Sequence, residues 1–444
     1  MRTSKMMGVS IAAVGLLLCP RPTSAQATPD SAQALSQEID QLKKDFEALK
    51  QQYGDRLSTL EARLATLQGT APPAAEPTPP AAAPTGQQPT AQIPSGAAGA
   101  GGPSGQLPIY GGAAAASKVF NPDIAAIGDF LGAAGSNSVN PSPAFEMHES
   151  ELAFQAVVDP YARADFFLSF GEEGVNLEEG YITFPAIPGG LLVKVGKMRA
   201  AFGKVNSLHN HVLPWADRPL VTENLVAGED GIDDAGISVA RLIPNPWIFL
   251  EATGQVFRGD SNELYHSSRP SDLSYVAHLR GYQDITENSN VDLGFSYSRG
   301  HNAAGIVNGT DVGDFTTSLY GIDATFRWRP LARSIYHSFV GRSEVIWSQR
   351  EQFDGQQNSV GFYVSGDYQF ARRWFAGARY DASDHPDNAQ LLDRGGSLIL
   401  TYWPSEFSQV RGQYRRTKYG TGQTADEFLF QFQFSIGAHG AHPF

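Results

Sequence analysis

Two histidines and several carboxylates lie close together in the stretch from residue 202 to residue 234. His209 and His211 are two positions apart, so in an extended segment their side chains would share one face. Two imidazoles and a carboxylate form a workable site for zinc or a similar divalent ion. The candidate metal ligands are His209, His211, Asp233 and Asp234. A solvated acidic loop without an ion is the alternative.

A long series of strands would have to position this loop. Over residues 119–444, segments that alternate between apolar and polar residues are separated in turn by a very short connection and a longer one. About seven tight turns and about eight loops predict about sixteen strands, an even number as in bacterial outer-membrane barrels. At the end of the chain, Phe428, Phe430, Phe432 and Phe434 would share one face while glutamines occupy the other.

The connections give the predicted barrel a direction. Trp247, Trp328, Trp374 and Trp403 lie beside short connections, where the periplasmic aromatic girdle of a barrel belongs. The longer connections, among them "QREQFDGQQN", would lie at the outer surface. We therefore predict an all-β fold, an antiparallel transmembrane β-barrel of about sixteen strands.

Three segments precede the barrel. Residues 1–27 have the basic start, short apolar run and small residues of a signal peptide, although a lipid anchor at Cys19 is the alternative. Residues 28–69 carry the apolar spacing of an α-helical coiled coil, and residues 70–118, rich in Pro, Ala and Gly, predict a disordered linker. The chain is therefore expected in the bacterial outer membrane, with its coil in the periplasm.

Composition and motifs argue against several other functions. The chain has 33 Lys and Arg against 46 Asp and Glu, a net charge of −13, which is unfavourable for binding nucleic acid. Neither a G-x-S-x-G nor an H-E-x-x-H stretch occurs, so no enzymatic activity is predicted. No cofactor is expected.

One pair of strands resembles a known family. The stretch "LEEGYITF" is followed by "LLVKVGKMRAAFGKVN", in which Lys194, Val195 and Gly196 lead into Phe202 and Gly203. This pattern resembles the porin O and P family of phosphate- and polyphosphate-selective outer-membrane channels. The resemblance implies a homotrimer of pores in which the third loop folds inward.

The third long loop is therefore the predicted constriction of the pore. Its charged residues in that role are Lys204, Arg218, Glu223, Glu229 and Asp230.

Strand parity predicts which other charged side chains line the pore. Those expected to point inward are Arg163, Glu251, Arg280, Asp292, Arg327, Arg342, Glu344, Asp367, Arg411 and Arg415. The family resemblance implies an arginine ladder and a lysine cluster that attract anions, yet this barrel has few lysines. Mixed charges that pair with one another in a general pore are the alternative.

These patterns predict an outer-membrane porin for small hydrophilic solutes or ions, with anion preference left open. One alternative is a channel that takes up a divalent metal through the third loop. Another is a structural anchor that joins the outer membrane to the cell wall through the coil. The expected partners are other copies of the chain in a homotrimer, the lipid bilayer, small solutes and, for the anchor, the cell wall.

The coiled coil makes a prediction about assembly. Its apolar positions are buried only when helices associate, so deleting residues 34–67 should weaken the oligomer while the barrel still folds. Light scattering of the purified protein in detergent measures the mass. Deleting residues 70–103 removes the same length without the apolar spacing and should change nothing. An unchanged mass in both deletions would leave the barrel walls as the contact between copies.

Overall fold

The computed structural model describes residues 123–171 and 174–437, which belong to one compact unit of residues 91–444. The predicted signal peptide, coiled coil and linker lie outside the described residues, so they stay predictions. Among the described residues, no helix is both long and apolar enough to cross a membrane.

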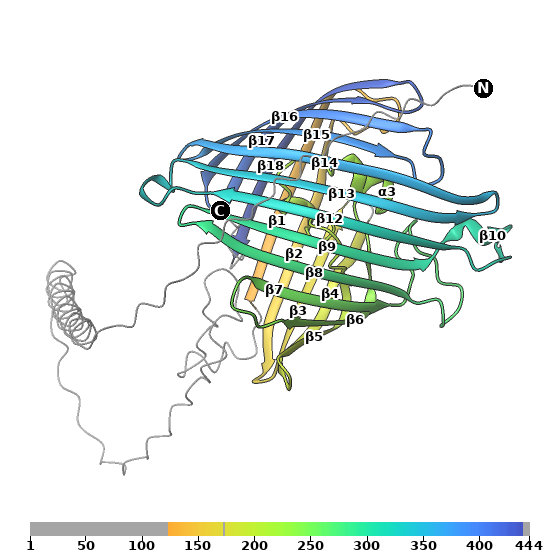
Figure 1. Cartoon of the computed structure of the whole chain (residues 1–444). Coiled ribbons are helices and arrows are strands. Elements are labelled where there is room, and N and C mark those ends of the chain that lie inside the picture. Colours follow the sequence, from red (N-terminus) through yellow and green to blue (C-terminus); the bar gives the residue numbers. More distant parts are fainter. Residues whose placement is uncertain (1–122, 172–173, 438–444) are drawn as a thin grey trace, which may run out of the picture. The chain divides into compact units, whose positions relative to one another are not determined.

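Sixteen strands form one closed antiparallel barrel (Figure 1), which confirms the predicted all-β fold. The first eight are β1 (Asp123–Ser136), β2 (Phe145–Asp159), β3 (Ala162–Gly171), β4 (Gly174–Ile187), β5 (Leu191–Arg199), β6 (Asp233–Leu242), β7 (Phe249–Phe257) and β8 (Ser274–Thr286). The others are β9 (Ser289–His301), β12 (Thr316–Trp328), β13 (Ser338–Gln352), β14 (Gly355–Ala371), β15 (Trp374–Asp384), β16 (Leu392–Ser405), β17 (Ser408–Lys418) and β18 (Thr424–Gly437). Strand β1 pairs with β18 and closes the ring.

Short elements occupy the connections. A small hairpin of β10 (Ile306–Val307) and β11 (Thr310–Asp311) lies between β9 and β12. The helical turns are η1 (Asn210–Val212), α3 (Leu220–Leu225), η2 (Ala303–Gly305) and η3 (Leu331–Arg333). Two of them, η1 and α3, belong to the connection between β5 and β6, which covers residues 200–232 and is called loop 3 below.

The two faces of the wall have opposite character. On β9, Phe295 is 53% exposed, whereas the next residue, Ser296, is 7% exposed and faces inward. On β18, Phe432 is exposed on the outer face, and Gln431 and Gln433 are buried on the inner one. An apolar outer face and a polar inner face are what lipid outside and water inside require. The alternation predicted for the C-terminal phenylalanines is confirmed.

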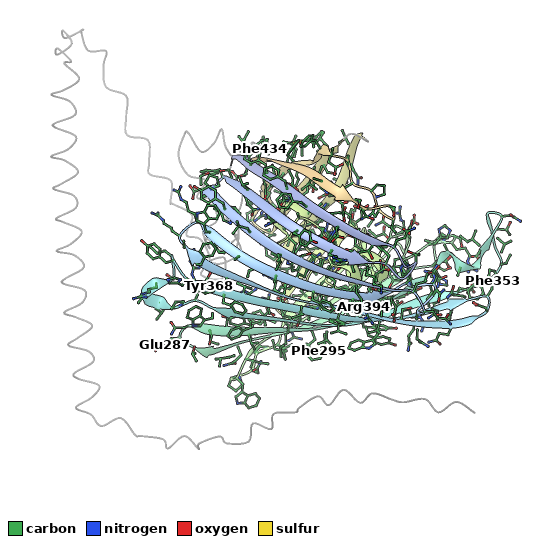
Figure 2. All side chains as sticks on the ribbon, turned by 90° about the horizontal axis from the view of Figure 1, so that it is seen from above. Glu287, Phe295, Phe353, Tyr368, Arg394 and Phe434 are labelled. Carbon is green, nitrogen blue, oxygen red and sulfur yellow. The ribbon has the colours of Figure 1, made fainter. Side chains whose placement is uncertain are left out.

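The longest connections, loop 3 and that between β7 and β8, lie at one end of the barrel, together with the two-residue connection from β13 to β14. Glu287, between β8 and β9, lies at one end, and Phe353, between β13 and β14, lies at the opposite end (Figure 2). The tryptophans predicted beside short connections lie at the end that Glu287 marks, Trp328 as the last residue of β12 and Trp374 as the first of β15. Trp247, in the connection from β6 to β7, is 79% exposed there.

One predicted long loop is wrong. The stretch "QREQFDGQQN" continues β13 and β14, which only Phe353 and Asp354 connect. Its polar residues resemble a loop in the sequence, but Asp354 and Gly355 form the short-range signal of a tight hairpin. The backbone groups of this extension pair with each other, so its side chains need no apolar face.

The outer face makes a prediction about the membrane. Phe295 lies at the middle of β9, opposite Leu279 of β8 and Ile322 of β12, both also exposed. Phe295→Arg should lower the free energy of unfolding from lipid vesicles by about 2–4 kcal/mol, because it places a charge in the hydrocarbon. Denaturant titration of the refolded barrel measures this cost.

The matched control lies near the end of the neighbouring strand. Ile285 is 57% exposed close to the last residue of β8. Ile285→Arg should cost only about 0–1 kcal/mol, because the side chain can reach the interface. Equal costs at both positions would contradict a barrel wall that faces lipid.

Candidate functional site

Loop 3 folds into the barrel and has a hydrophobic core of its own. Nine of its apolar residues are buried, although the inner wall around them is mostly polar: Ala200, Phe202, Val205, Leu213, Trp215, Val221, Leu225, Val226 and Ile232. They pack with the few apolar side chains that the wall turns inward, among them Leu319, Ile346, Tyr363 and Ile399. Apolar residues of this number would be costly in a solvated loop, so burial against the wall stabilises the inward fold.

Trp215 is the largest side chain in this core. It is 1% exposed, and its ring lies edge-on to that of Tyr363 of β14, with 5.1 Å between the ring centroids. The guanidinium of Arg379 lies 4.9 Å from the Trp215 ring centroid, within the range of a cation–π interaction. The indole therefore connects loop 3 to β14 and β15.

Helix α3 lies against the inner wall at β14 and β15 (Figure 1). It begins after Pro219, whose ring suits a helix start. Val221 of α3 approaches Gly361 of β14 so closely that a Cβ on Gly361 would lie 2.8 Å from a Val221 methyl carbon. A larger residue than glycine at this position would displace the helix.

Asp217 connects loop 3 to two strands through ion pairs. Its Oδ2 lies 2.9 Å from a nitrogen of Arg379 on β15 and 2.8 Å from a nitrogen of Arg415 on β17. Burial alone would raise the pKa of Asp217, but the two guanidinium groups outweigh it and lower the pKa to about 2. Arg379 and Arg415 also pair with Asp381 and Glu427, so each charge is compensated.

The first part of loop 3 is attached to other strands of the wall, β9 and β13. Lys204 pairs with Asp292 of β9 at 3.3 Å, and the backbone amide of Gly203 donates to Ser296 at 2.9 Å. Gly203 has a φ of 59°, and a Cβ there would overlap the Glu344 carboxylate. A residue other than glycine would be strained and would clash at this position.

A second polar cluster surrounds His209, which lies between Lys204 and Asp217 in loop 3. His209 Nδ1 is 2.7 Å from Glu151 of β2 and 2.8 Å from Glu178 of β4, and His209 Nε2 is 2.9 Å from Glu179. Burial lowers the pKa of His209, but the hydrogen bonds to these three glutamates outweigh it and raise the pKa well above its usual range. The ring of His211 lies 5.7 Å from that of His209.

Loop 3 leaves a cavity of about 370 Å³ between itself and the wall formed by β1, β17 and β18. Six carboxylates line it, from Asp129, Glu146, Asp217, Glu223, Glu229 and Asp393. Its two arginines, Arg218 and Arg415, are both engaged in hydrogen bonds. The cavity also reaches residues 139–143 of the first outer loop, so it is open toward that end of the barrel.

The residues predicted to line the pore do point inward, and their charges are largely paired. Arg163 pairs with Asp165, Arg342 with Asp367, Arg280 with Asp292, and Arg415 with Glu427. A nitrogen of Arg327 lies 3.9 Å from Asp292, and Glu251 lies opposite Arg280 in the register. The sequence left two alternatives open, an arginine ladder that attracts anions and mixed charges that pair with one another. The observed ion pairs agree with the second.

Three of these predicted residues lie under loop 3 and do not line open space. Asp292 and Glu344 are 1% exposed and Arg411 is 3% exposed. Arg411 donates to the backbone oxygen of Trp215, and Glu344 accepts from the amide of Val205. Strand parity gives the direction of a side chain, but it does not show that another segment covers it.

The residues predicted to form the constriction also divide into exposed and buried ones. Glu223, Glu229 and Asp230 have exposed side chains. Arg218 is 4% exposed and donates to the backbone oxygens of Val205 and Leu208, so it stabilises the fold of the loop.

The structure does not place Asp233 and Asp234 with the two histidines. Both residues begin β6 opposite the end of β5, because the strand starts earlier than the sequence indicated. Asp233 pairs with Lys197 at 2.8 Å, and Asp234 accepts from the backbone amide of Gly259. The carboxylates beside the histidines come from β2 and β4, which are separated from loop 3 in the sequence.

Several site residues were missed in the sequence. No sequence motif surrounds Asp217, Arg379, Glu149 or Glu151. The alternation of side chains along β15 and β2 could have shown that Arg379, Glu149 and Glu151 point inward, but it gives no information about Asp217 in loop 3. Glu178 and Glu179 are neighbours that both turn inward, since the register of β3 and β4 shifts beside them. Such a bulge is not visible in the sequence.

Comparisons with known proteins show the fold of this chain. No family model matches it. It is 29% identical over 343 residues to an uncharacterized protein of Aquifex aeolicus, covering 69% of this chain and 71% of that one. Among solved structures, OprB of Pseudomonas putida has a TM-score of 0.51 at 11% identity, covering 71% of this chain and 94% of its own. An anion-selective porin from Comamonas acidovorans has a TM-score of 0.50 at 11% identity, covering 70% and 98%.

The ion pairs of Asp217 make a prediction about pH. The pKa of Asp217 is about 2, below the ordinary value of 3.8. A carboxyl with a lowered pKa stabilises the fold above its unfolded-state pKa and loses this contribution as the pH falls toward the folded value. Asp217→Asn should therefore lower the free energy of unfolding by about 2 kcal/mol at pH 6, and the difference should shrink between about pH 4 and about pH 2.

Denaturant titrations of both proteins at several pH values measure that difference. Asp230→Asn is the control, because it removes a carboxylate from the same loop at an exposed position. A difference for Asp217→Asn that does not depend on pH would show that the ion pairs do not stabilise loop 3.

Proposed function

We propose that this chain is an outer-membrane porin that passes small hydrophilic solutes and ions through the space beside loop 3. The observation that carries the proposal is a closed barrel with an apolar outer face whose polar interior holds one folded loop and an open cavity beside it. Lipid can cover such an outer face, and the inner one can be wetted. The fold shared with solved porins agrees with this function.

The charges around the cavity favour cations over anions. Its six carboxylates outnumber its two arginines and two histidines together. Of these basic groups, Arg415 is paired with Glu427 and Asp217, and His148 is paired with Glu229. A low-dielectric wall strengthens the field of such charges on ions that pass. We therefore propose a mild preference for cations, which differs from the anion preference that the inward arginines and the family resemblance suggested.

Other parts of the predicted function stay proposals. Assembly as a homotrimer, location in the bacterial outer membrane and membership of the porin O and P family agree with the barrel, and each needs its own measurement. The described residues offer no observation that favours a cell-wall anchor or a metal-uptake channel over a general pore. The absence of enzymatic activity stays a prediction from the sequence.

Single-channel recording in planar bilayers tests the pore and its selectivity. The wild type should conduct, and its reversal potential in a salt gradient should show cation preference, most clearly in dilute electrolyte where screening is weakest. The double variant Glu223→Gln and Glu229→Gln removes two carboxyl groups of loop 3 beside the cavity. Burial raises the pKa of Glu223 to about 7, so the recording is made at pH 8, where both carboxyl groups are largely ionised in the wild type. Its reversal potential should move toward anions with little change in folding.

Glu287→Gln is the matched control. It removes a carboxylate in the short connection between β8 and β9, at the end of the barrel opposite Phe353 (Figure 2) and outside the lining of the cavity. Its reversal potential should equal that of the wild type. A protein that inserts into the bilayer without conducting would overturn the porin function, and an anion-selective wild type would overturn the assigned preference alone.

A further inference from the structure

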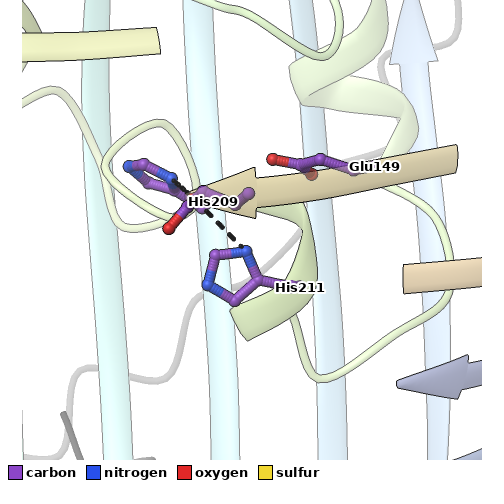
Figure 3. Close-up of side chains that lie close together, drawn as sticks. Glu149, His209 and His211 are labelled. Atoms are coloured by element: carbon purple, nitrogen blue, oxygen red, sulfur yellow. Dashed lines mark hydrogen bonds and ion pairs between the residues drawn. The ribbon is translucent and has the colours of Figure 1, made fainter. Parts of the chain in front are cut away.

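Four potential metal-binding side chains converge where loop 3 meets the wall at β2. Glu149 and Glu151 come from β2, and His209 and His211 come from loop 3. One donor atom of each residue lies within 4.8 Å of the donor atoms of the other three. In Figure 3 the carboxylate of Glu149 extends from its strand toward the two imidazoles.

The local structure explains why these donors meet. Glu149 and Glu151 are two residues apart on a strand, so both point into the barrel. They are 5% and 3% exposed. His209 and His211 are held above them because η1 is anchored by Asn210, which accepts hydrogen bonds from the buried Arg218. The donors are therefore fixed by two separate elements before any ion binds.

Glu149 lacks the partners that a buried carboxylate needs. It is 5% exposed, and no N–H or hydroxyl group of the described residues donates to either of its oxygens. Its neighbour within hydrogen-bond distance is another carboxylate, that of Glu178. A buried charge without a partner is costly, so native sites pair it or use it to bind a metal. Among the described residues, no arginine forms an ion pair with Glu149, and Arg199 lies nearer to Glu178. Glu151, by contrast, is paired with His209.

The surrounding charges are also unbalanced toward negative. Glu178 and Glu179 add two carboxylates beside Glu149 and Glu151. The basic side chains beside these four carboxylates are those of His209 and Arg199. The guanidinium of Arg199 is 3.9 Å from Glu178. Four carboxylates in one buried region with so few cations repel one another, and a divalent ion would relieve this repulsion.

A path to the cluster exists. A cavity of about 590 Å³ is lined by Glu149 and Glu178, and also by Glu146, Glu229 and Asp230. It reaches residues 169–171 at the end of β3. A hydrated cation could therefore approach Glu149 from the outer end along carboxylates.

We propose that Glu149, Glu151, His209 and His211 bind one divalent cation of the zinc class, which fastens loop 3 to the barrel wall at β2. Two imidazole nitrogens and two carboxylate oxygens suit tetrahedral zinc or a related transition metal. Calcium and magnesium prefer oxygen ligands alone, so this set does not favour them.

The neighbouring residues support this assignment. In the proposed site, His209 binds the ion through Nδ1, the nitrogen that faces Glu151. Its other nitrogen, Nε2, is 2.9 Å from Glu179 and can donate its proton to that carboxylate. A carboxylate behind a ligating histidine fixes its orientation and raises its basicity as a ligand. Glu179 is thus a positioning residue for the site. The binding is separate from transport, so it is tested without any current measurement.

Calorimetric titration with zinc chloride tests the site in the full-length protein, purified in detergent and treated with a chelator. The wild type should bind one zinc ion per chain and melt at a higher temperature with zinc than without. Cobalt(II) should give the visible absorption of a tetrahedral nitrogen and oxygen site. A wild type that binds no zinc overturns the proposal, whatever the variants do.

Three substitutions locate the ligands. Glu149→Gln and His211→Gln should each weaken zinc binding by at least about tenfold, and Glu179→Gln by about 10–100-fold through loss of the positioning hydrogen bond. Glu146→Gln is the matched control, since it removes the same charge from the same strand and cavity outside the four ligands. Its affinity should be little changed.

Equal losses in Glu146→Gln and Glu149→Gln would mean that zinc is attracted only by the general negative field, and would overturn the site. Each variant is checked for the faster gel migration of the unheated barrel. If a variant does not fold, the stoichiometry and the cobalt spectrum of the wild type still decide the question.

Discussion

Closure of the barrel by the pairing of β1 with β18 is the constraint on which the other features depend. In the hydrocarbon every backbone amide and carbonyl needs a partner, and a ring of antiparallel strands supplies one without leaving an edge. Phe130 of β1 lies opposite Phe432 of β18, and the register continues along both strands. Once the ring is closed, alternation along each strand divides the side chains into a lipid face and an inner face.

The inner face then has to accommodate loop 3, whose apolar residues cannot remain in water. The wall provides Tyr363, Leu319 and Ile346 as a local apolar surface within an otherwise polar interior. Trp215 fills the contact, and Asp217 compensates Arg379 and Arg415 at its border. Packing and ion pairing thus fix the loop to the wall, and the space that remains beside it has a defined position and lining.

Loop 3 also separates the buried charges of the lumen. Guanidinium groups gather on β15 and β17 around Asp217, whereas carboxylates gather on β2 and β4 around His209. The first group is closely balanced, because Asp381 and Glu427 complete its ion pairs. The second has more carboxylates than cations. The proposed cation preference and the proposed metal site have the same cause, since carboxylates outnumber basic side chains both in the cavity beside loop 3 and around His209.

The sequence by itself determined the architecture. Alternation in segments such as that of Phe428 to Phe434, together with the turns and their tryptophans, predicted a closed barrel of about sixteen strands, because a period of two is a local property. The same period places Arg280 and Asp367 on the inner face, where they pair with Asp292 and Arg342. It failed at Asp354 and Gly355, where a polar strand extension was taken for a loop.

Only the tertiary structure decided what the inward residues do. Asp292, Glu344 and Arg411 are covered because loop 3 lies over them, and coverage depends on a segment far away in the chain. The histidines of loop 3 meet Glu149 and Glu151 rather than Asp233 and Asp234. Their partners follow from barrel closure and from the bulge at Glu178, since sequence spacing carries no information about contacts between distant strands.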